Sequence, residues 1–182
     1  GHVELAQCLV TAGAELNATR DDGLTALMLA AQLGKLETAQ CLVTAGAELN
    51  AKANGGWTAL MWAAKNGHVA VAQFLITAGA ELNVKTEKGY TPLMWAAQQG
   101  HVELAQCLVT AGAELNASPG LADVILRLAA EKGNLEFVQH LVGAGAELEA
   151  KTEHGSTALM LAAEKGHVET AQFLVTAGAE LN

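Results

Sequence analysis

Apolar residues along the chain follow the spacing of short helices, and the same pattern returns with a fixed 33-residue period. Between residues 52 and 84, the segment 59–64 is apolar on nearly every side, and Gly67 follows as a stop signal. The segment 69–78 then carries apolar residues at helical intervals, namely Val69, Ala72, Leu75 and Ile76. Each unit therefore predicts two helices and a turn. Because one such unit cannot bury its apolar faces alone, neighbouring units are expected to stack.

The repeat is regular enough to set the boundaries of the units. Ala-Gly-Ala-Glu-Leu-Asn occurs at 12–17, 45–50, 78–83, 111–116 and 177–182, and a variant ending in Glu149 fills the remaining unit without an insertion. We expect a leading half unit at 1–18, followed by units at 19–51, 52–84, 85–117, 118–150 and 151–182. Residues 1–17 are identical to residues 100–116, which indicates recent duplication or deliberate construction.

The third unit carries the motifs that identify a family. It reads Gly56-Trp57-Thr58-Ala59-Leu60-Met61, then paired alanines, then Gly67-His68, then Gly79-Ala80-Glu81-Leu82-Asn83. The whole chain resembles an ankyrin-repeat array, whose units carry Gly-x-Thr-Pro-Leu-His, paired alanines, Gly-His and Gly-Ala-Asp-Val-Asn. The resemblance implies an all-α solenoid of helix-turn-helix units with hairpin-like finger loops, forming one domain over residues 1–182. It also implies protein–protein recognition on a concave face, without catalysis or a cofactor.

The chain departs from the family pattern inside its units. Methionine stands where the family has histidine, at Met28, Met61, Met94 and Met160, so the fingers are expected to be less firmly held. The fifth unit has lost the turn glycine at Ala122 and the capping threonine at Val124. We expect a shorter or bent finger there, and a first helix that starts about one residue early, with Asp123 as a substitute cap.

The two ends of the array also differ from the family, because neither has a polar capping face. The apolar faces at Val3–Val10 and Phe173–Val175 are therefore expected to pack against further residues or against a second copy. We interpret the chain as a fragment of a longer array, with end-to-end self-association as one way to cover these faces.

Composition and charge narrow the range of functions. The net charge of −9 lacks the basic footprint that nucleic-acid binding needs, and no apolar run is long enough for a membrane span. The three cysteines do not form a disulfide framework, which fits a reducing, cytoplasmic location. Most histidines share one register, in which stacked repeats hold them too far apart for a metal site. We expect no metal, no disulfide and no enzymatic activity.

Four of the seven aromatic residues form a pattern of their own. Trp57 and Tyr90 stand one period apart, each just after the turn glycine. Trp62 and Trp95 also stand one period apart, each on a first helix. They predict either internal packing or one binding patch, with rings about 10 Å apart and a partner side chain between them. The expected partner-binding residues are Trp57, Trp62, Lys65, Asn66, Lys88, Tyr90, Trp95, Gln98 and Gln99.

Other hypotheses remain open at the level of the sequence. A ring could stack on a nucleotide base while Lys65 or Lys88 meets phosphate, which would make the chain a small-molecule or nucleotide binder. The chain could also be the non-catalytic segment of a larger enzyme, channel or effector. Finally, the identity of residues 1–17 and 100–116 favours an engineered scaffold, whereas the cysteines and the irregular fifth unit count against it.

Overall fold

Pairs of short helices make up the part of the chain that the computed structural model describes, residues 15–180. The first helices of the pairs are α2 (Ala26–Gln32), α4 (Ala59–Asn66), α6 (Pro92–Gln98), α8 (Leu121–Glu131) and α10 (Ala158–Glu164). The second helices are α3 (Leu36–Thr44), α5 (Val69–Thr77), α7 (Val102–Thr110), α9 (Leu135–Gly143) and α11 (Val168–Thr176). A 3-10 turn, η1 (Asn54–Gly56), completes the regular elements, and residues 15–180 contain no strand. The predicted all-α repeat fold is therefore confirmed.

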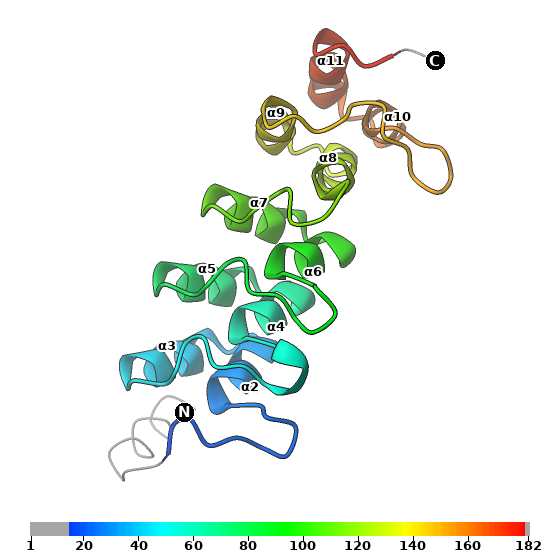
Figure 1. Ribbon diagram of the computed structural model, residues 1–182. Coiled ribbons are helices and arrows are strands. Elements are labelled where there is room, and N and C mark those ends of the chain that lie inside the picture. Colours follow the sequence, from blue (N-terminus) through cyan, green and yellow to red (C-terminus); the bar gives the residue numbers. More distant parts are fainter. Residues whose placement is uncertain (1–14, 181–182) are drawn as a thin grey trace. The chain divides into compact units, whose positions relative to one another are not determined.

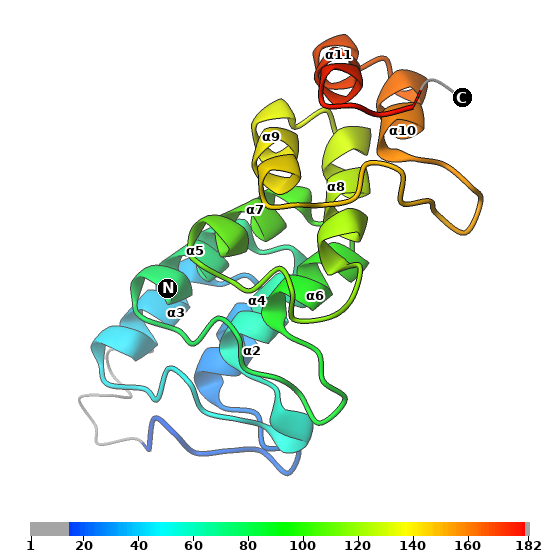
Figure 2. The same ribbon diagram turned by 45° about the horizontal axis from the view of Figure 1, so that its top comes forward.

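The helices pack as two compact units, one ending at Glu114 and the other beginning at Leu115. In the first unit α2, α4 and α6 form one row and α3, α5 and α7 form a second row beside it (Figure 1). In the second unit α8 packs on α10 and α9 on α11 (Figure 2). None of the helices within the described range is both long and apolar enough to cross a membrane.

Small and apolar side chains explain why the first helices can stack closely. Ala63, Ala64 and Ala96 are fully buried, so adjacent helices approach without a large side chain between them. In α5, Ala72 and Leu75 are buried as the spacing predicts, whereas Val69 and Ile76 are only half-buried. Val71 takes the remaining buried position on this helix.

Threonine caps start the first helices in four of the units. The side chains of Thr25, Thr58, Thr91 and Thr157 each accept a hydrogen bond from the backbone N–H three residues later. Two of the methionines that replace the family's histidine, Met28 and Met61, are fully buried and fill apolar space. At Met94 the sulfur also accepts a hydrogen bond from the Thr91 N–H at 3.5 Å.

Hydrogen bonds between repeats follow the same period. Nε2 of His68, His101 and His167 lies 3.0–3.2 Å from a first-helix carbonyl oxygen of the preceding repeat. These three histidines are therefore structural, as expected, while His2 lies outside the described residues. Asparagine side chains form a second ladder: for example, Asn50 Oδ1 accepts from Glu81 N at 3.0 Å.

The fifth unit differs from the others more than the sequence prediction allowed. By the register of the other units its first helix should start at residue 125, yet α8 begins at Leu121 and replaces the finger. Pro119 stands where the other fingers donate a backbone hydrogen bond, and Ala122 stands where they have a left-handed glycine. The finger therefore cannot close, and the chain enters the helix early.

Asp123 does not cap this helix, which corrects the expectation from the sequence. The N-cap residue is Gly120, and Asp123 lies inside the first turn of α8. Its Oδ1 accepts a hydrogen bond from Glu147 N at 2.8 Å. Asp123 thus takes the place that an asparagine holds in the ladder of the other repeats.

The contact between neighbouring fingers leads to a first prediction. A Cβ on Gly23, where φ is +77°, would lie 2.9 Å from the backbone nitrogen of Asn54, whereas a Cβ on Gly89, where φ is +81°, would meet open space. Gly89→Ala should therefore cost only the left-handed backbone strain, about 1–2 kcal/mol. Gly23→Ala should destabilise the protein further, because the finger must move away from Asn54, whose N–H donates to Asp22 O.

Urea unfolding of both variants measures the difference. The two variants share the same backbone strain, so Gly89→Ala is the matched control for Gly23→Ala. Equal losses of unfolding free energy would contradict the idea that neighbouring fingers hold each other in place.

Candidate functional site

The finger loops and first helices of the third and fourth units place four aromatic side chains on one face. Each finger closes with a backbone hydrogen bond, from Ala53 N to Trp57 O at 2.8 Å and from Thr86 N to Tyr90 O at 3.0 Å. These bonds fix Trp57 and Tyr90 directly before the threonine caps of α4 and α6. Trp62 lies one turn further along α4, and Trp95 holds the same position on α6.

The four rings contact one another and form what we call the aromatic cluster: Trp57, Trp62, Tyr90 and Trp95. Trp57 stacks on Trp62 with 4.4 Å between ring centroids and packs on Trp95 at 4.8 Å. Tyr90 stacks on Trp95, also at 4.8 Å. The cluster crosses the boundary between two repeats, because Trp57 belongs to one and Trp95 to the next.

The contact between the two repeats joins rings of different registers and is shorter than the spacing of about 10 Å expected from the packing distance of neighbouring helices. The side chain of Trp57 leans across to the following repeat, so its centroid is only 4.8 Å from that of Trp95. No gap is left between neighbouring rings for a partner side chain.

All four rings are half-buried, so they are neither exposed finger tips nor entirely core. The indole N–H groups of Trp62 and Trp95 are buried and have no hydrogen-bond acceptor within the described part of the chain. Such donors are rare in folded proteins, because a buried unpaired polar group costs free energy.

Lys65 is the polar residue at the centre of the cluster. Its ammonium nitrogen lies 5.2 Å from the ring centroid of Trp57, 5.5 Å from that of Trp62 and 5.3 Å from that of Trp95. These distances are those of cation–π interactions. Among residues 15–180, ion pairs join Arg20 to Asp22 and Lys165 to Glu164, and none involves Lys65.

The other expected site residues lie at the edge of the cluster. Asn66 is exposed, and its side-chain amide donates to the Trp62 carbonyl oxygen at 2.8 Å. Lys88 is exposed on the finger that carries Tyr90, and Gln98 and Gln99 are exposed at the end of α6, which carries Trp95. Their side chains make no hydrogen bond or ring contact to the cluster in the described structure, and the backbone N–H of Gln99 donates to the Trp95 carbonyl oxygen at 3.1 Å. The structure thus brings together the four rings and Lys65, and leaves the remaining four residues around them.

Sequence reasoning overlooked two lysines near this face. Lys52 and Lys85 line one shallow pocket together with Glu81 and Asn83, at the base of the two fingers. The two lysines stand one 33-residue period apart in the sequence. The signal that could have identified them is the local excess of positive charge in a chain whose net charge is −9.

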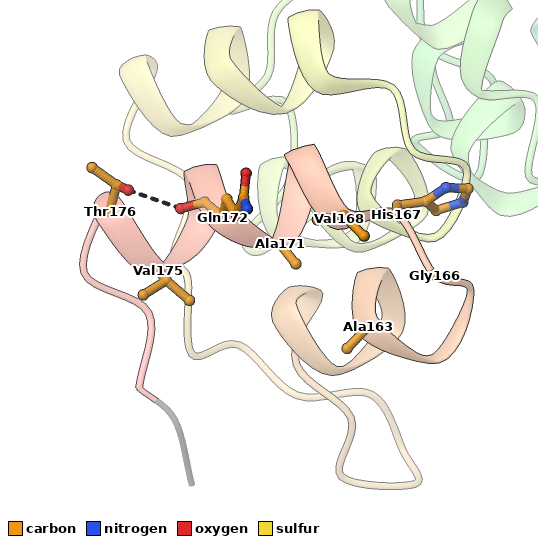
Figure 3. Close-up of a pocket in the computed structure, with 8 residues that line it drawn as sticks. All are labelled: Ala163, Gly166, His167, Val168, Ala171, Gln172, Val175 and Thr176. Carbon is orange, nitrogen blue, oxygen red and sulfur yellow. Dashed lines mark hydrogen bonds between the residues drawn. The ribbon is translucent and has the colours of Figure 1, made fainter.

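A second surface feature lies on the last repeat. Val168 is 63% exposed, although Val102 in the same register is only 7% exposed. Val168, Ala171 and Val175 line a shallow apolar groove along α10 and α11 (Figure 3). On the N-terminal side, the expected apolar face at Val3–Val10 lies outside the described residues.

The cysteines and histidines do not form a reactive site in the described range. No three His, Cys, Asp or Glu side chains between residues 15 and 180 are grouped so that they could hold a metal ion. Cys107 is half-buried, and its sulfur accepts a hydrogen bond from Gln73 Nε2 at 3.3 Å. Cys41 is half-buried on α3, and Cys8 lies outside the described residues.

The ring contacts predict unequal losses of stability for the two finger residues, Trp57 and Tyr90. Trp57→Ala removes two ring contacts, each contributing about 0.5–1.5 kcal/mol beyond area burial, so we expect a loss of about 1–3 kcal/mol. Tyr90→Ala removes one contact and should cost about half as much. Chemical denaturation of both variants tests this order, and a larger loss for Tyr90→Ala would contradict it.

Comparison with known proteins agrees with the architecture. A family model described as ankyrin repeats (3 copies) matches residues 1–86, 56–119 and 122–182, and so spans nearly the whole chain. No curated protein matches the chain significantly. The regular repeat period, the paired helices with capped fingers and the family match lead to one conclusion: the chain belongs to the ankyrin-repeat family.

Proposed function

We propose that this chain recognises a partner protein through the first-helix and finger face of its third and fourth repeats, the side that forms the concave groove in ankyrin arrays. Ankyrin repeats serve generally as protein-interaction modules. The contact residues of the proposal are those of the aromatic cluster and its surroundings: Trp57, Trp62, Lys65, Asn66, Lys88, Tyr90, Trp95, Gln98 and Gln99.

The aromatic cluster is the observation that carries this proposal. Trp and Tyr are enriched at binding hot spots, because they bury a large area and lose little conformational entropy. Four half-buried rings in contact with one another are already ordered before a partner arrives. A partner that covers them gains apolar burial without the cost of ordering flexible side chains.

The face is proposed to bind without catalysing a reaction. The polar groups proposed around the rings are lysines and amides, and this set contains no nucleophile paired with a general base. No cofactor is part of the proposal. Two of the cysteines, Cys41 and Cys107, are half-buried within helices, which agrees with a reducing, cytoplasmic location.

Binding of a nucleotide is the weaker alternative. A base stacked on one ring, with Lys65 or Lys88 on phosphate, would use the same face. However, the stacked rings leave no slot for a base between them, and Lys65 Nζ already lies over three of the rings. We therefore keep a protein partner as the proposed function.

Other repeats of the chain indicate substitutions that test this proposal while preserving the fold. The registers of Trp57 and Tyr90 hold Leu24 and Ser156 in other units, so the double variant Trp57→Leu/Tyr90→Ser uses residues that the fold accepts. For a partner isolated by affinity capture, we expect this variant to weaken binding by about 2 kcal/mol or more, as at hot spots generally. Titration calorimetry measures the loss.

The matched control lies on a second helix, away from the fingers. Phe74→His places there the residue found at the same register in His140. This control should leave the affinity unchanged. If the double variant binds as tightly as the native chain while remaining folded, recognition takes place elsewhere.

We further propose that the apolar groove on α10 and α11 packs against a second copy of the chain. Residues 100–116 form the repeat whose α7 packs on α5, and the sequence of this segment is repeated without change at residues 1–17. The segment that contains α5, residues 67–83, differs from the segment of the last repeat, residues 166–182, at three positions only. A second copy therefore contains, at residues 1–17, the same sequence as the segment whose helix packs on a surface similar to that of the last repeat.

Self-association can be tested with two equally exposed apolar residues. Val168 is 63% exposed in the groove, and Leu33 is 62% exposed on a different repeat. We expect light scattering to show concentration-dependent association that Val168→Glu abolishes, since it buries a charge in the contact, and that Leu33→Glu leaves unchanged. A native chain that stays monomeric at every concentration would refute this second proposal.

A further inference from the structure

We propose that the partner presents an acidic segment, in which a carboxylate meets Lys65 and a neighbouring apolar side chain covers the exposed surface of Trp57 and Tyr90. This inference rests on the proposed function and specifies the chemistry of the partner.

Charge distribution along the repeats is the first argument. The fingers and first helices of the third and fourth units, residues 52–66 and 85–99, carry four lysines against one glutamate, although the whole chain has a net charge of −9. The corresponding segment 19–33 has one arginine and two aspartates, and 118–132 and 151–165 each balance two basic with two acidic residues. The aromatic cluster thus lies in the one described stretch of fingers and first helices with an excess of positive charge.

Placement of the lysines is the second argument. Lys65 is held over the rings, and Lys52 and Lys85, together with the single acidic residue Glu81, line one pocket at the base of the two fingers that carry Trp57 and Tyr90. Lys88 is exposed in the finger that leads to Tyr90. A positive surface around an apolar centre favours a negatively charged partner, both in the encounter and in the orientation of the complex.

The unpaired ammonium of Lys65 is the third argument. It has ring faces and no carboxylate as its neighbours in the described structure, and it can only donate hydrogen bonds. The unpaired indole N–H groups of Trp62 and Trp95 do not add to this argument, because they are buried and a partner on the surface does not reach them. A carboxylate gives the ammonium a strong, charge-assisted hydrogen bond.

The same arrangement disfavours a basic partner. Aromatic faces attract cations, but Lys65 already fills the cation position over three of these rings. An arginine or lysine of a partner that approached one of these rings would be repelled by the positive charge of Lys65. The repulsion would act against binding, whereas a carboxylate can approach the ammonium while the rings remain in contact with it.

An unbiased peptide selection tests the proposal without knowledge of the natural partner. The probe is a phage-displayed library of random peptides about twelve residues long, panned on the whole chain and counter-selected on Trp57→Leu/Tyr90→Ser. Peptides that need the rings are then synthesised, and their dissociation constants are measured by fluorescence polarisation. We expect them to be rich in Asp and Glu next to Phe, Trp or Leu.

Two lysine variants isolate the contribution of the charge. Lys65→Gln introduces the residue that occupies the same register at Gln98, and Lys132→Gln, the control, introduces the residue found at Gln99. We expect Lys65→Gln to weaken the peptides by about tenfold and Lys132→Gln to have no effect. Raising the salt concentration should weaken binding to the native chain, because ions screen charges beyond about 8 Å at physiological ionic strength.

Each outcome separates the inference from the function on which it rests. Ring-dependent peptides that are basic or neutral, or that bind Lys65→Gln as tightly as the native chain, would overturn the acidic partner and leave recognition by the rings standing. A selection that yields no ring-dependent peptide would overturn both. Lys65-dependent binding of ATP without binding of acidic peptides would reassign the face to a nucleotide.

Discussion

Unbroken spacing of the repeats is the constraint on which the other features depend. A helix pair of this composition cannot bury its apolar faces alone, so each repeat needs a neighbour in register. Because no residue is inserted, hydrogen bonds between neighbouring repeats can recur at the same register. The histidine bonds to first-helix carbonyls and the asparagine ladder both follow from this spacing.

The residues of the aromatic cluster also recur with the repeat period, but the contact between the two repeats joins different positions of the repeat. Equivalent residues on adjacent repeats usually stand side by side, whereas Trp57 leans over to contact Trp95 of the next repeat. The four rings and Lys65 are thereby joined by ring contacts and cation–π interactions. Two buried indole N–H groups have no acceptor among residues 15–180, which costs free energy of folding.

Most of the fold could be predicted from the sequence, because period, caps and stop glycines are local signals. Thr58 caps α4 and Gly67 ends it as its sequence context indicates. In the fifth unit the sequence showed a lost turn, but the length of the change depends on Pro119, whose missing N–H removes the finger's closing bond. That consequence becomes clear only once the bond is seen in the other fingers.

The sequence placed the four rings and Lys65 on the same two repeats, but it did not predict how their side chains meet. Registers assign Trp57, Tyr90 and Lys65 to one face, but side-chain directions decide which atoms meet. A spacing of backbones near about 10 Å says little about long rings, which can close that distance by leaning. The position of Lys65 over the rings depends on the same directions and has no signal in the repeat pattern.

The central claim is that the rings of two repeats form one unit, and a double-mutant cycle between Trp57 and Trp95 tests it most directly. Each is replaced by Leu, the residue found at their registers in Leu24 and Leu161, alone and together. The account predicts a coupling of about 1 kcal/mol in the free energy of unfolding, since the two rings are in contact. Losses that add up to within about 0.3 kcal/mol would contradict it.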